Sequence, residues 1–408
     1  MLNIYAVTNG CVEGQLSTKQ IERFFKTNEF ALVKTPEKAD LVVFYACGLT
    51  EQDEKNSLET IKNIKSKMKS SAKLVVWGCL PKINPQSLKD IYDGRLIGSL
   101  ERNFFEEIPN KITVPLDDIN CSADADELNS IAVPKQSAYK QVDPITTAII
   151  LFKQGLDKIR TTIVMNPSIY YVKIGTGCMG KCTYCSEHPV FGKPKSRSVD
   201  EIISEFKKGL QEGYNRFSLI ATDTGSYGMD IGYTLPKLLR KIMEANDKKD
   251  FKIIINQLEL LHLSEICADM DDIFSSGKIE KLECPVQSGS NRILELMNRG
   301  YTAEEWRTRM IQINQKYPKI RLGTHFMIGF PTETEEDFNA TLQLLNPPLF
   351  LDFIYAIGYS NRPRVRASSM SDQISETTKE LRYKKLKQKY AQMYVCHFMK
   401  LRQSAFLL

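Results

Sequence analysis

Short apolar runs alternate with longer amphipathic segments along the first hundred residues. Strands are predicted at residues 2–7, 41–45 and 74–77, and helices at 18–26 and 53–70. The strands are almost continuously apolar, which is typical of a parallel sheet covered by helices on both faces. The pattern therefore predicts a small doubly wound α/β domain over residues 1–115.

The same alternation returns further along the chain. Strands are predicted at 170–174, 216–221, 252–255, 281–286, 321–328 and 350–357, and the helices between them include 199–212, 235–246, 290–299 and 303–316. Six strand–helix units in this order predict an open partial (β/α)6 barrel over residues 168–360. In such barrels the chemistry gathers on the loops that follow the strands.

Two segments lie outside these units. Residues 116–167 are less regular, with an amphipathic helix predicted at 145–163, and they form either a connector or an insertion. Residues 361–408 form a C-terminal segment with a predicted basic helix at 375–403.

Composition sets the class of protein. A chain of 408 residues is too long for one ordinary core, and 42% hydrophobic with 25% charged residues describes a soluble globular protein. We expect no membrane association, because apolar runs are short and the N-terminus lacks the pattern of a signal peptide. Ten cysteines without a secretion signal favour reduced thiols and metal ligation, so a cytoplasmic location is predicted.

Charge says less. The net charge of +6 is mild, but eight Lys/Arg and one acid, Glu380, lie between Lys379 and Arg402. Such a segment suits contact with phosphates and suits a solvated helix face equally well.

The most informative motif is a C-x3-C-x2-C run formed by Cys178, Cys182 and Cys185, directly after a predicted strand. A four-iron cluster held by three thiolates keeps one iron open for a ligand. Zinc sites usually complete a tetrahedron with four ligands at other spacings, so zinc is the less favoured alternative.

Three further cysteines, Cys11, Cys47 and Cys79, each follow one of the three N-terminal strands. The carboxyl ends of parallel strands meet at one edge of a sheet, so these thiols should lie together. Each has a glycine beside it, which lets the backbone approach a bulky ligand. Buried structural cysteines are the alternative; we predict a second cluster with three thiolates.

Several stretches resemble the radical S-adenosyl-L-methionine (SAM) methylthiotransferases, which replace a C–H bond with C–S–CH3. They are the cysteine run, Pro-Val-Gln-Ser-Gly-Ser at 285–290, Met-Asn-Arg-Gly-Tyr-Thr at 297–302, and Gly-Phe-Pro-Thr-Glu-Thr-Glu-Glu-Asp-Phe at 329–338. Residues 221–232 are similar to the archaeal and eukaryotic branch, which acts on threonylcarbamoyladenosine beside the tRNA anticodon. That branch usually has a glutamate where this chain has Thr222.

The resemblance implies two 4Fe-4S clusters, SAM and a reducing electron donor, with no catalytic residue beyond the clusters. The loop cluster would bind SAM, and the N-terminal cluster would carry the inserted sulfur. Motif positions and strand ends give the predicted SAM contacts: Tyr184, Asp223, Thr224, Gln287, Ser288, Gly289, Ser290 and Gly329. Asp223 is equally suited to capping a turn.

The acceptor is the open question. The family usually ends in a TRAM domain that grips tRNA, and we expect none after Gln403. Its usual Tyr-Ser-x-Arg-Pro-Gly-Thr-x-Ala segment reads Tyr-Ser-Asn-Arg-Pro-Arg-Val-Arg-Ala at 359–367. A tRNA adenosine is the leading prediction, and a peptide or protein side chain is the alternative. A non-catalytic iron–sulfur or zinc protein on this scaffold is a third reading.

Overall fold

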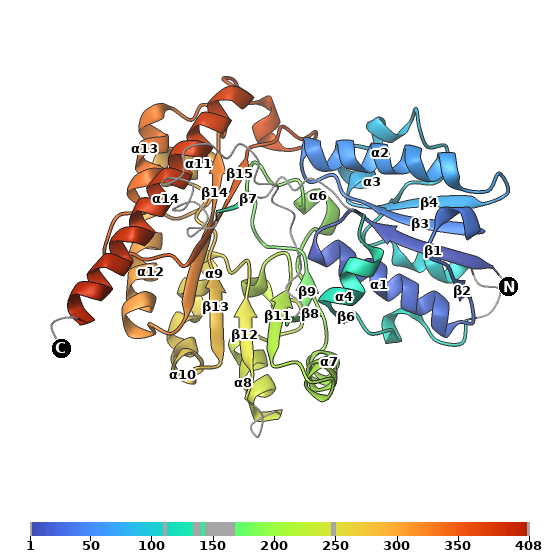
Figure 1. The fold of residues 1–408 in the computed structure, drawn as a ribbon, viewed down its shortest axis with the longest axis horizontal. Helices are drawn as coiled ribbons and strands as arrows, with labels where there is room; N and C mark the ends of the chain where they lie inside the picture. Colours follow the sequence, from blue (N-terminus) through green and yellow to red (C-terminus); the bar gives the residue numbers. More distant parts are fainter. Residues whose placement is uncertain (1, 109–111, 134–139, 143–167, 246–249, 406–408) are drawn as a thin grey trace.

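The computed structural model describes residues 2–108, 112–133, 140–142, 168–245 and 250–405. Two main sheets organise this part of the chain, one N-terminal and one formed by the later strands (Figure 1). The predicted fold class, a doubly wound α/β domain followed by an open partial barrel and a C-terminal helix, is confirmed. The predicted helix at 145–163 lies outside the described residues.

The N-terminal sheet has five parallel strands in the order β2-β1-β3-β4-β5. They are β1 (Asn3–Thr8), β2 (Ala31–Leu32), β3 (Leu41–Ala46), β4 (Lys73–Gly78) and β5 (Ile97–Gly98). The three predicted strands agree with β1, β3 and β4 to within one residue at each end. The two-residue edge strands β2 and β5 are too short to leave a hydrophobic pattern, and the sequence did not reveal them.

Helices cover both faces of this sheet, which explains its apolar strands (Figure 1). On β3, Val43 and Tyr45 share a core with α1 (Val12–Thr27), while Val42 and Phe44 share one with α2 (Glu51–Lys67). Successive side chains of a strand point to opposite faces, so a strand buried on both sides needs apolar residues throughout.

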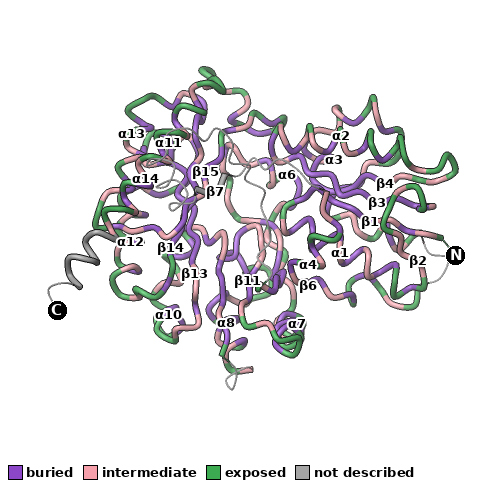
Figure 2. Tube along the Cα trace, viewed as in Figure 1, coloured by how far each residue is buried: buried purple, intermediate pink, exposed green. Residues whose placement is uncertain are grey.

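The second sheet has eight strands in the order β6-β8-β11-β12-β13-β14-β15-β7. Its six central strands are parallel: β8 (Tyr170–Lys173), β11 (Arg216–Ile220), β12 (Lys252–Ile255), β13 (Ile279–Glu283), β14 (Arg321–Ile328) and β15 (Phe353–Gly358). They are the six predicted strands, although β13 ends three residues before the predicted limit. Figure 2 shows buried positions concentrated along these strands.

Helices pack on the outer side of the sheet (Figure 1). They are α7 (Val199–Gln211), α8 (Leu235–Ala245), α9 (Leu260–Ile266), α10 (Asp271–Ser275), α11 (Asn291–Leu296), α12 (Ala303–Lys316) and α13 (Glu335–Gln343). Ser198, Thr302 and Thr334 begin α7, α12 and α13 with reciprocal capping boxes. A capping box satisfies two backbone N–H groups that the first turn leaves free, so these residues define where the helices start.

The described part of the connector joins the two sheets. β6 (Ser122–Asp124) adds an antiparallel edge to β8, and β7 (Lys140–Val142) adds another to β15. The helix α4 (Ala125–Ile131) follows β6, and its Leu128 packs with Leu16 of α1 and Tyr171 of β8. This small shared core fixes the N-terminal sheet against the barrel.

The chain ends in α14 (Glu376–Ala405), close to the predicted 375–403. Leu386 and Tyr390 bury one side of it against the barrel core. Within the described residues, no helix is long and apolar enough to cross a membrane.

Candidate functional site

The cysteine loop connects two short antiparallel strands. β9 (Gly175–Thr176) pairs with β10 (Lys195–Ser196) in antiparallel fashion. Gly177, next in the chain, has a φ of +81°, and a side chain there would meet the carbonyl oxygen of Lys193 at 2.1 Å. Only glycine fits this turn without strain, so it directs the chain into the loop.

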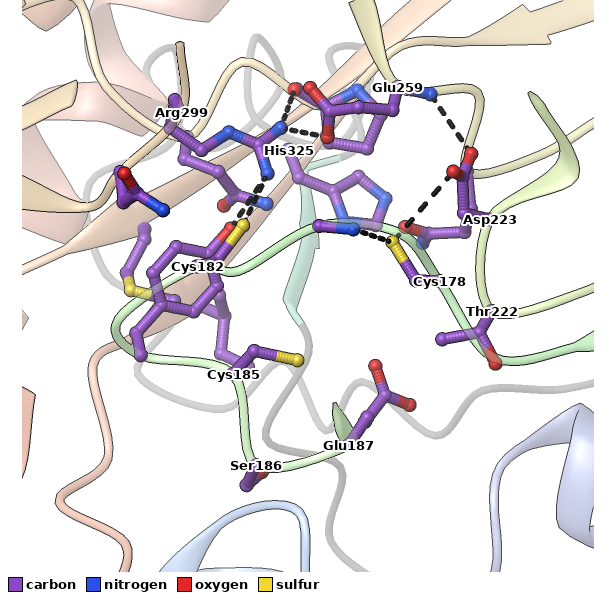
Figure 3. A pocket seen from close by; sticks show the side chains of 18 of the residues that line it. Cys178, Cys182, Cys185, Ser186, Glu187, Thr222, Asp223, Glu259, Arg299 and His325 are labelled. Atoms are coloured by element: carbon purple, nitrogen blue, oxygen red, sulfur yellow. Dashed lines mark hydrogen bonds and ion pairs between the residues drawn. The ribbon is translucent and has the colours of Figure 1, made fainter. Parts of the chain in front are cut away.

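Cys178, Cys182 and Cys185 all line a cavity of about 400 Å³ at the carboxyl ends of the barrel strands (Figure 3). The same three thiols also line a neighbouring space of about 30 Å³. Asp223 follows β11 and Gln287 follows β13, and both form part of the cavity wall. The cavity thus lies where parallel β/α folds place their chemistry.

Two of the loop thiols, Cys178 and Cys185, have a raised pKa. Burial raises the pKa of Cys178, and the nearby charge of Asp223 raises it further. Burial, followed by the charge of Glu187, raises the pKa of Cys185 to about 12. Metal ligation requires the thiolate form, so a bound metal would have to supply the positive charge that deprotonates these groups.

Arg299 is a buried cation beside this loop. Its Nη1 donates hydrogen bonds to Sγ of Cys182 at 3.3 Å and to the hydroxyl of Tyr184 at 3.1 Å. Its Nε donates to the hydroxyl of Tyr301 at 2.9 Å, and its Nη2 donates to the carbonyl oxygen of Pro285 at 2.9 Å.

The fifth donor of Arg299 is used as well, because Nη2 also forms an ion pair with Glu259 (Figure 3). All five guanidinium N–H groups therefore have a partner. The arrangement fixes a positive charge next to Cys182, and a lysine could not make this set of contacts.

Asp223 pairs with His262 behind the loop. Its Oδ2 lies 2.7 Å from Nδ1 of His262, and its Oδ1 accepts from the backbone N–H of Gly225 at 3.0 Å. Burial acts to raise the pKa of Asp223, but the hydrogen bonds and charge of its neighbours, His262 first, outweigh burial and lower it. Asp223 therefore caps a turn and also faces the cavity.

Some buried polar groups in the cavity wall have no hydrogen-bond partner among the described residues. They are two oxygens, Oε1 of Gln287 and the hydroxyl of Tyr359, and Nε of Arg362 is a third such group. Gln287 also has a φ of +75°, which costs a non-glycine residue roughly 1–2 kcal/mol. Strained residues and unpaired buried polar groups occur together at ligand sites, so a polar ligand is expected here.

The N-terminal thiols meet at the edge of their sheet. Cys47 and Cys79 directly follow β3 and β4 and are buried, and Cys11 follows β1 and is exposed. Burial raises the pKa of Cys79 first, and the thiols of Cys47 and Cys11 raise it further, so the three groups are electrostatic neighbours. The hydroxyl of Tyr45 lies 3.0 Å from Sγ of Cys79.

The two groups of thiols share neighbours at the boundary between the sheets. Leu49, two residues after Cys47, lines the same cavity as the loop thiols, and its carbonyl oxygen accepts from Oγ of Ser186 at 3.3 Å. Glu187 is close enough to raise the pKa of both Cys79 and Cys185. Burial, then the charge of Glu13, raises the pKa of Glu187 itself to about 7.

The predicted SAM contacts divide into two groups. Tyr184, Asp223 and Gln287 line the cavity. The others use their polar atoms in nearby structure: Thr224 donates to Asn256, Ser288 and Gly289 contact Thr341, Ser290 caps α11, and the N–H of Gly329 donates to Glu333.

Sequence reasoning missed the charged neighbours of the site. No motif singled out His262 or His325, but His262 pairs with Asp223, and Nε2 of His325 lies 3.0 Å from Oε1 of Glu283. Arg299 stood in a quoted motif without a role, and nothing in the sequence indicated that Glu259 is its counter-ion. Such pairs join neighbouring strand ends that are far apart in the chain.

Comparison with known proteins agrees with this arrangement. The radical SAM superfamily matches residues 172–345, and a family described as uncharacterized protein family UPF0004 matches residues 3–97. A probable threonylcarbamoyladenosine tRNA methylthiotransferase of Pyrococcus abyssi is 29% identical, with 89% of this chain and 78% of the relative covered. The ribosomal protein uS12 methylthiotransferase RimO of Thermodesulfovibrio yellowstonii is 29% identical, with 95% and 82% covered.

These matches support a radical SAM methylthiotransferase. The structure of the radical SAM methyltransferase TsrM from Kitasatospora setae is similar in fold to this chain, with a TM-score of 0.56 at 12% identity over 84% of this chain and 70% of that chain. The matches imply SAM and two 4Fe-4S clusters as cofactors, as predicted.

The residues of this methylthiotransferase fit two such clusters. Each of the two places gathers three thiols, the number that leaves one iron of a cubane open. Within the described residues, no group of three or more Cys, His, Asp or Glu side chains is arranged to hold a single metal ion. A cubane differs from a single ion because each thiolate binds its own iron.

Proposed function

We propose that this methylthiotransferase converts a C–H bond of a tRNA adenosine, the threonylcarbamoyladenosine next to the anticodon, into C–S–CH3. The observation that carries the reaction is that three thiols of the barrel loop line one cavity, and that Glu187 is an electrostatic neighbour of both Cys185 in that loop and Cys79 in the N-terminal group of three thiols. The acceptor rests on relatives of 27–29% identity, four of which are named as probable threonylcarbamoyladenosine tRNA methylthiotransferases.

The cysteines receive their roles within this proposal. Cys178, Cys182 and Cys185 hold the cluster that works with SAM, and the N-terminal set, Cys11, Cys47 and Cys79, holds the second cluster. When bound, the first centre supplies abstraction of hydrogen from an unactivated C–H bond and the second supplies the methylthio group.

The remaining residues position the reactants. Gln287 and Tyr359 offer unpaired polar atoms to SAM or the target base, and Asp223 offers a carboxylate held by His262. Thr224, Ser288, Gly289, Ser290 and Gly329 shape the loops from behind, through the contacts described above. Leu49, Met179 and Leu261 contribute apolar surface to the cavity wall.

The test uses anaerobically reconstituted protein with dithionite as reductant. It is supplied with tRNA that carries threonylcarbamoyladenosine, or with the same tRNA lacking the modification, and the nucleosides are analysed by mass spectrometry. The proposal expects the methylthio nucleoside only from the modified tRNA, and none from the Cys47→Ala protein. Formation of 5′-deoxyadenosine without any methylthio nucleoside would refute the acceptor.

A protein side chain is the second candidate, because the uS12 methylthiotransferase covers 95% of this chain at 29% identity. The same reconstituted protein is incubated with ribosomal proteins, and their peptides are searched for an added methylthio group. Modified peptides together with unmodified tRNA would replace the first proposal with this one.

A further inference from the structure

The segment 360–366 connects β15 to the C-terminal part of the chain, and we call it the strap. It leaves the barrel and reaches the N-terminal domain, where Oγ of Ser360 accepts from the N–H of Glu51 at 2.9 Å and Arg362 forms an ion pair with Glu54. Figure 1 shows this orange-red segment approaching α2. Ser360 and Arg362 also line the cavity, so the strap borders the candidate active site.

Two arginines of the strap, Arg364 and Arg366, are exposed. Nη1 of Arg364 donates to the carbonyl oxygen of Lys82 at 3.1 Å, and Nη2 of Arg366 donates to the carbonyl oxygen of Lys181 in the cysteine loop. Among the described residues, neither arginine forms an ion pair with a carboxylate. Their positive charges are held in place and remain uncompensated.

The backbone adds a second observation. Arg364 has a φ of +68°, the left-handed region that costs a non-glycine residue roughly 1–2 kcal/mol. The exposed side chain of Arg364 makes one hydrogen bond to a neutral carbonyl oxygen, which does not offset this backbone strain in the folded chain. Strain of this kind is retained at sites that serve a ligand.

The C-terminal helix, whose basic residues the sequence offered as a phosphate surface, behaves differently. Lys379 pairs with Glu376, Arg382 pairs with Glu333, and Lys385 pairs with Glu335. The pairs of Arg382 and Lys385 hold α14 against the barrel, and the pair of Lys379 lies within the helix itself. In the strap, Arg362 pairs with Glu54. The nearby Lys82 pairs with Glu101. Neither glutamate forms an ion pair with Arg364 or Arg366, so the charges of these two arginines are available to a ligand.

The cavity rim beside the strap combines charge with apolar surface. Lys181 is exposed and lines the cavity, and the lining residues Met179 and Leu261 are exposed by 50% and 43%. Recognition of single-stranded RNA uses this combination, because cations contact phosphates and flat or apolar side chains pack against bases.

We propose that Arg364 and Arg366, together with Lys181, bind the phosphates of the RNA nucleotides that flank the base held in the cavity. This inference rests on the proposed tRNA acceptor. It places the phosphate contacts on the strap and the cysteine loop, and it assigns the basic face of α14 a structural role.

The experiment measures binding of a modified anticodon stem-loop to the reconstituted protein at several salt concentrations. The logarithm of the affinity falls with the logarithm of the salt concentration in proportion to the number of phosphates neutralised. The double variant R364G/R366Q should reduce this slope by about 2, roughly one for each cation removed. Glycine suits a φ of +68°, so Arg364→Gly removes the charge without disturbing the fold.

Two further variants control the result. K384Q/K389Q removes two cations from α14 and should leave the slope unchanged, while R364K/R366K keeps the charge and should retain it. A slope unchanged in R364G/R366Q, or a slope that falls only in K384Q/K389Q, would overturn the strap proposal. The proposed acceptor is tested separately by methylthiolation of the stem-loop. Wild-type protein that binds the stem-loop but never methylthiolates it would contradict the proposed function and leave the strap proposal intact.

Discussion

The two thiol sites differ in how much of the chain has to fold before the sulfur atoms meet. In the barrel, one loop carries Cys178, Cys182 and Cys185, and two short antiparallel strands flank that loop. In the N-terminal domain, Cys11, Cys47 and Cys79 come from three strand ends and meet only when the parallel sheet has formed. The first site is a local motif, whereas the second is a product of topology.

Their surroundings differ as well. Charged side chains surround the barrel loop, with Arg299 paired to Glu259 and Asp223 paired to His262. The N-terminal thiols lie beside the hydroxyl of Tyr45 and the apolar core under the sheet. The barrel site should therefore respond to changes of charge, and the N-terminal site to changes of packing.

Removing single thiols should have the largest effect and should separate the two sites. Replacing any of Cys178, Cys182 or Cys185 by alanine is expected to abolish 5′-deoxyadenosine formation. Replacing Cys11, Cys47 or Cys79 should leave that product and stop methylthio transfer. Chromatography of both products measures this, with Cys267→Ala, outside both sites, as control. A Cys47→Ala protein that still transfers methylthio groups would contradict the assignment.

A packing defect in one domain should have a smaller effect and should weaken the thiol site of that domain first. Phe44 is buried between the N-terminal sheet and α2, and Phe44→Ala should cost about 3–5 kcal/mol of unfolding free energy. We expect the protein to lose the N-terminal cluster first, with iron falling from about eight to about four per chain while SAM cleavage persists. Phe217→Ala in the barrel core is the matched control, and equal iron loss in both variants would remove the contrast.

A change at Arg299 should affect the barrel site alone. The guanidinium hydrogen bond to Sγ of Cys182 stabilises negative charge, and the reduced cluster carries more of it. Arg299→Lys should therefore shift the reduction potential of that cluster to a more negative value, as followed by electron paramagnetic resonance during a redox titration. Arg309→Lys is the control, since Arg309 contacts Sγ of Cys267 outside the site. An unchanged potential in Arg299→Lys would contradict the role.

The smallest effect concerns pH. Burial lowers the pKa of His262, but its hydrogen bond to Asp223 and the charge of Asp223 outweigh burial and raise it above the ordinary 6.5. The stabilisation is fully present below 6.5 and is lost as the pH rises through the raised value in the folded protein. His262→Gln should cost about 2 kcal/mol near pH 5.5 and clearly less near pH 9, as measured by chemical unfolding. An equal cost at both pH values would show that the pair is not charged.

The sequence predicted most where one segment determines its own structure. The strands β12 and β14 and the helix α12 were predicted to the residue, because their hydrophobic periods and the capping box of Thr302 are local signals. The six cysteines were predicted as cluster ligands from their spacing and from their place after strands, and that role stays a prediction.

The sequence failed where structure depends on distant partners. The antiparallel edge strands β6 and β7 carry only three residues each, and their pairing is decided by the barrel. The pair of Arg299 with Glu259 joins two loops 40 positions apart, so no local pattern indicates it. The sequence also did not show which cations of the basic C-terminal helix are paired, because the glutamate partners of Arg382 and Lys385 lie outside that helix.

Mössbauer spectroscopy of protein reconstituted anaerobically with 57Fe tests the central claim most directly. Wild-type protein should show two 4Fe-4S clusters, about eight irons per chain, and the triple variants C178A/C182A/C185A and C11A/C47A/C79A should each keep one cluster with about four irons. A single cluster in the wild-type protein, or a triple variant that retains both, would contradict the account.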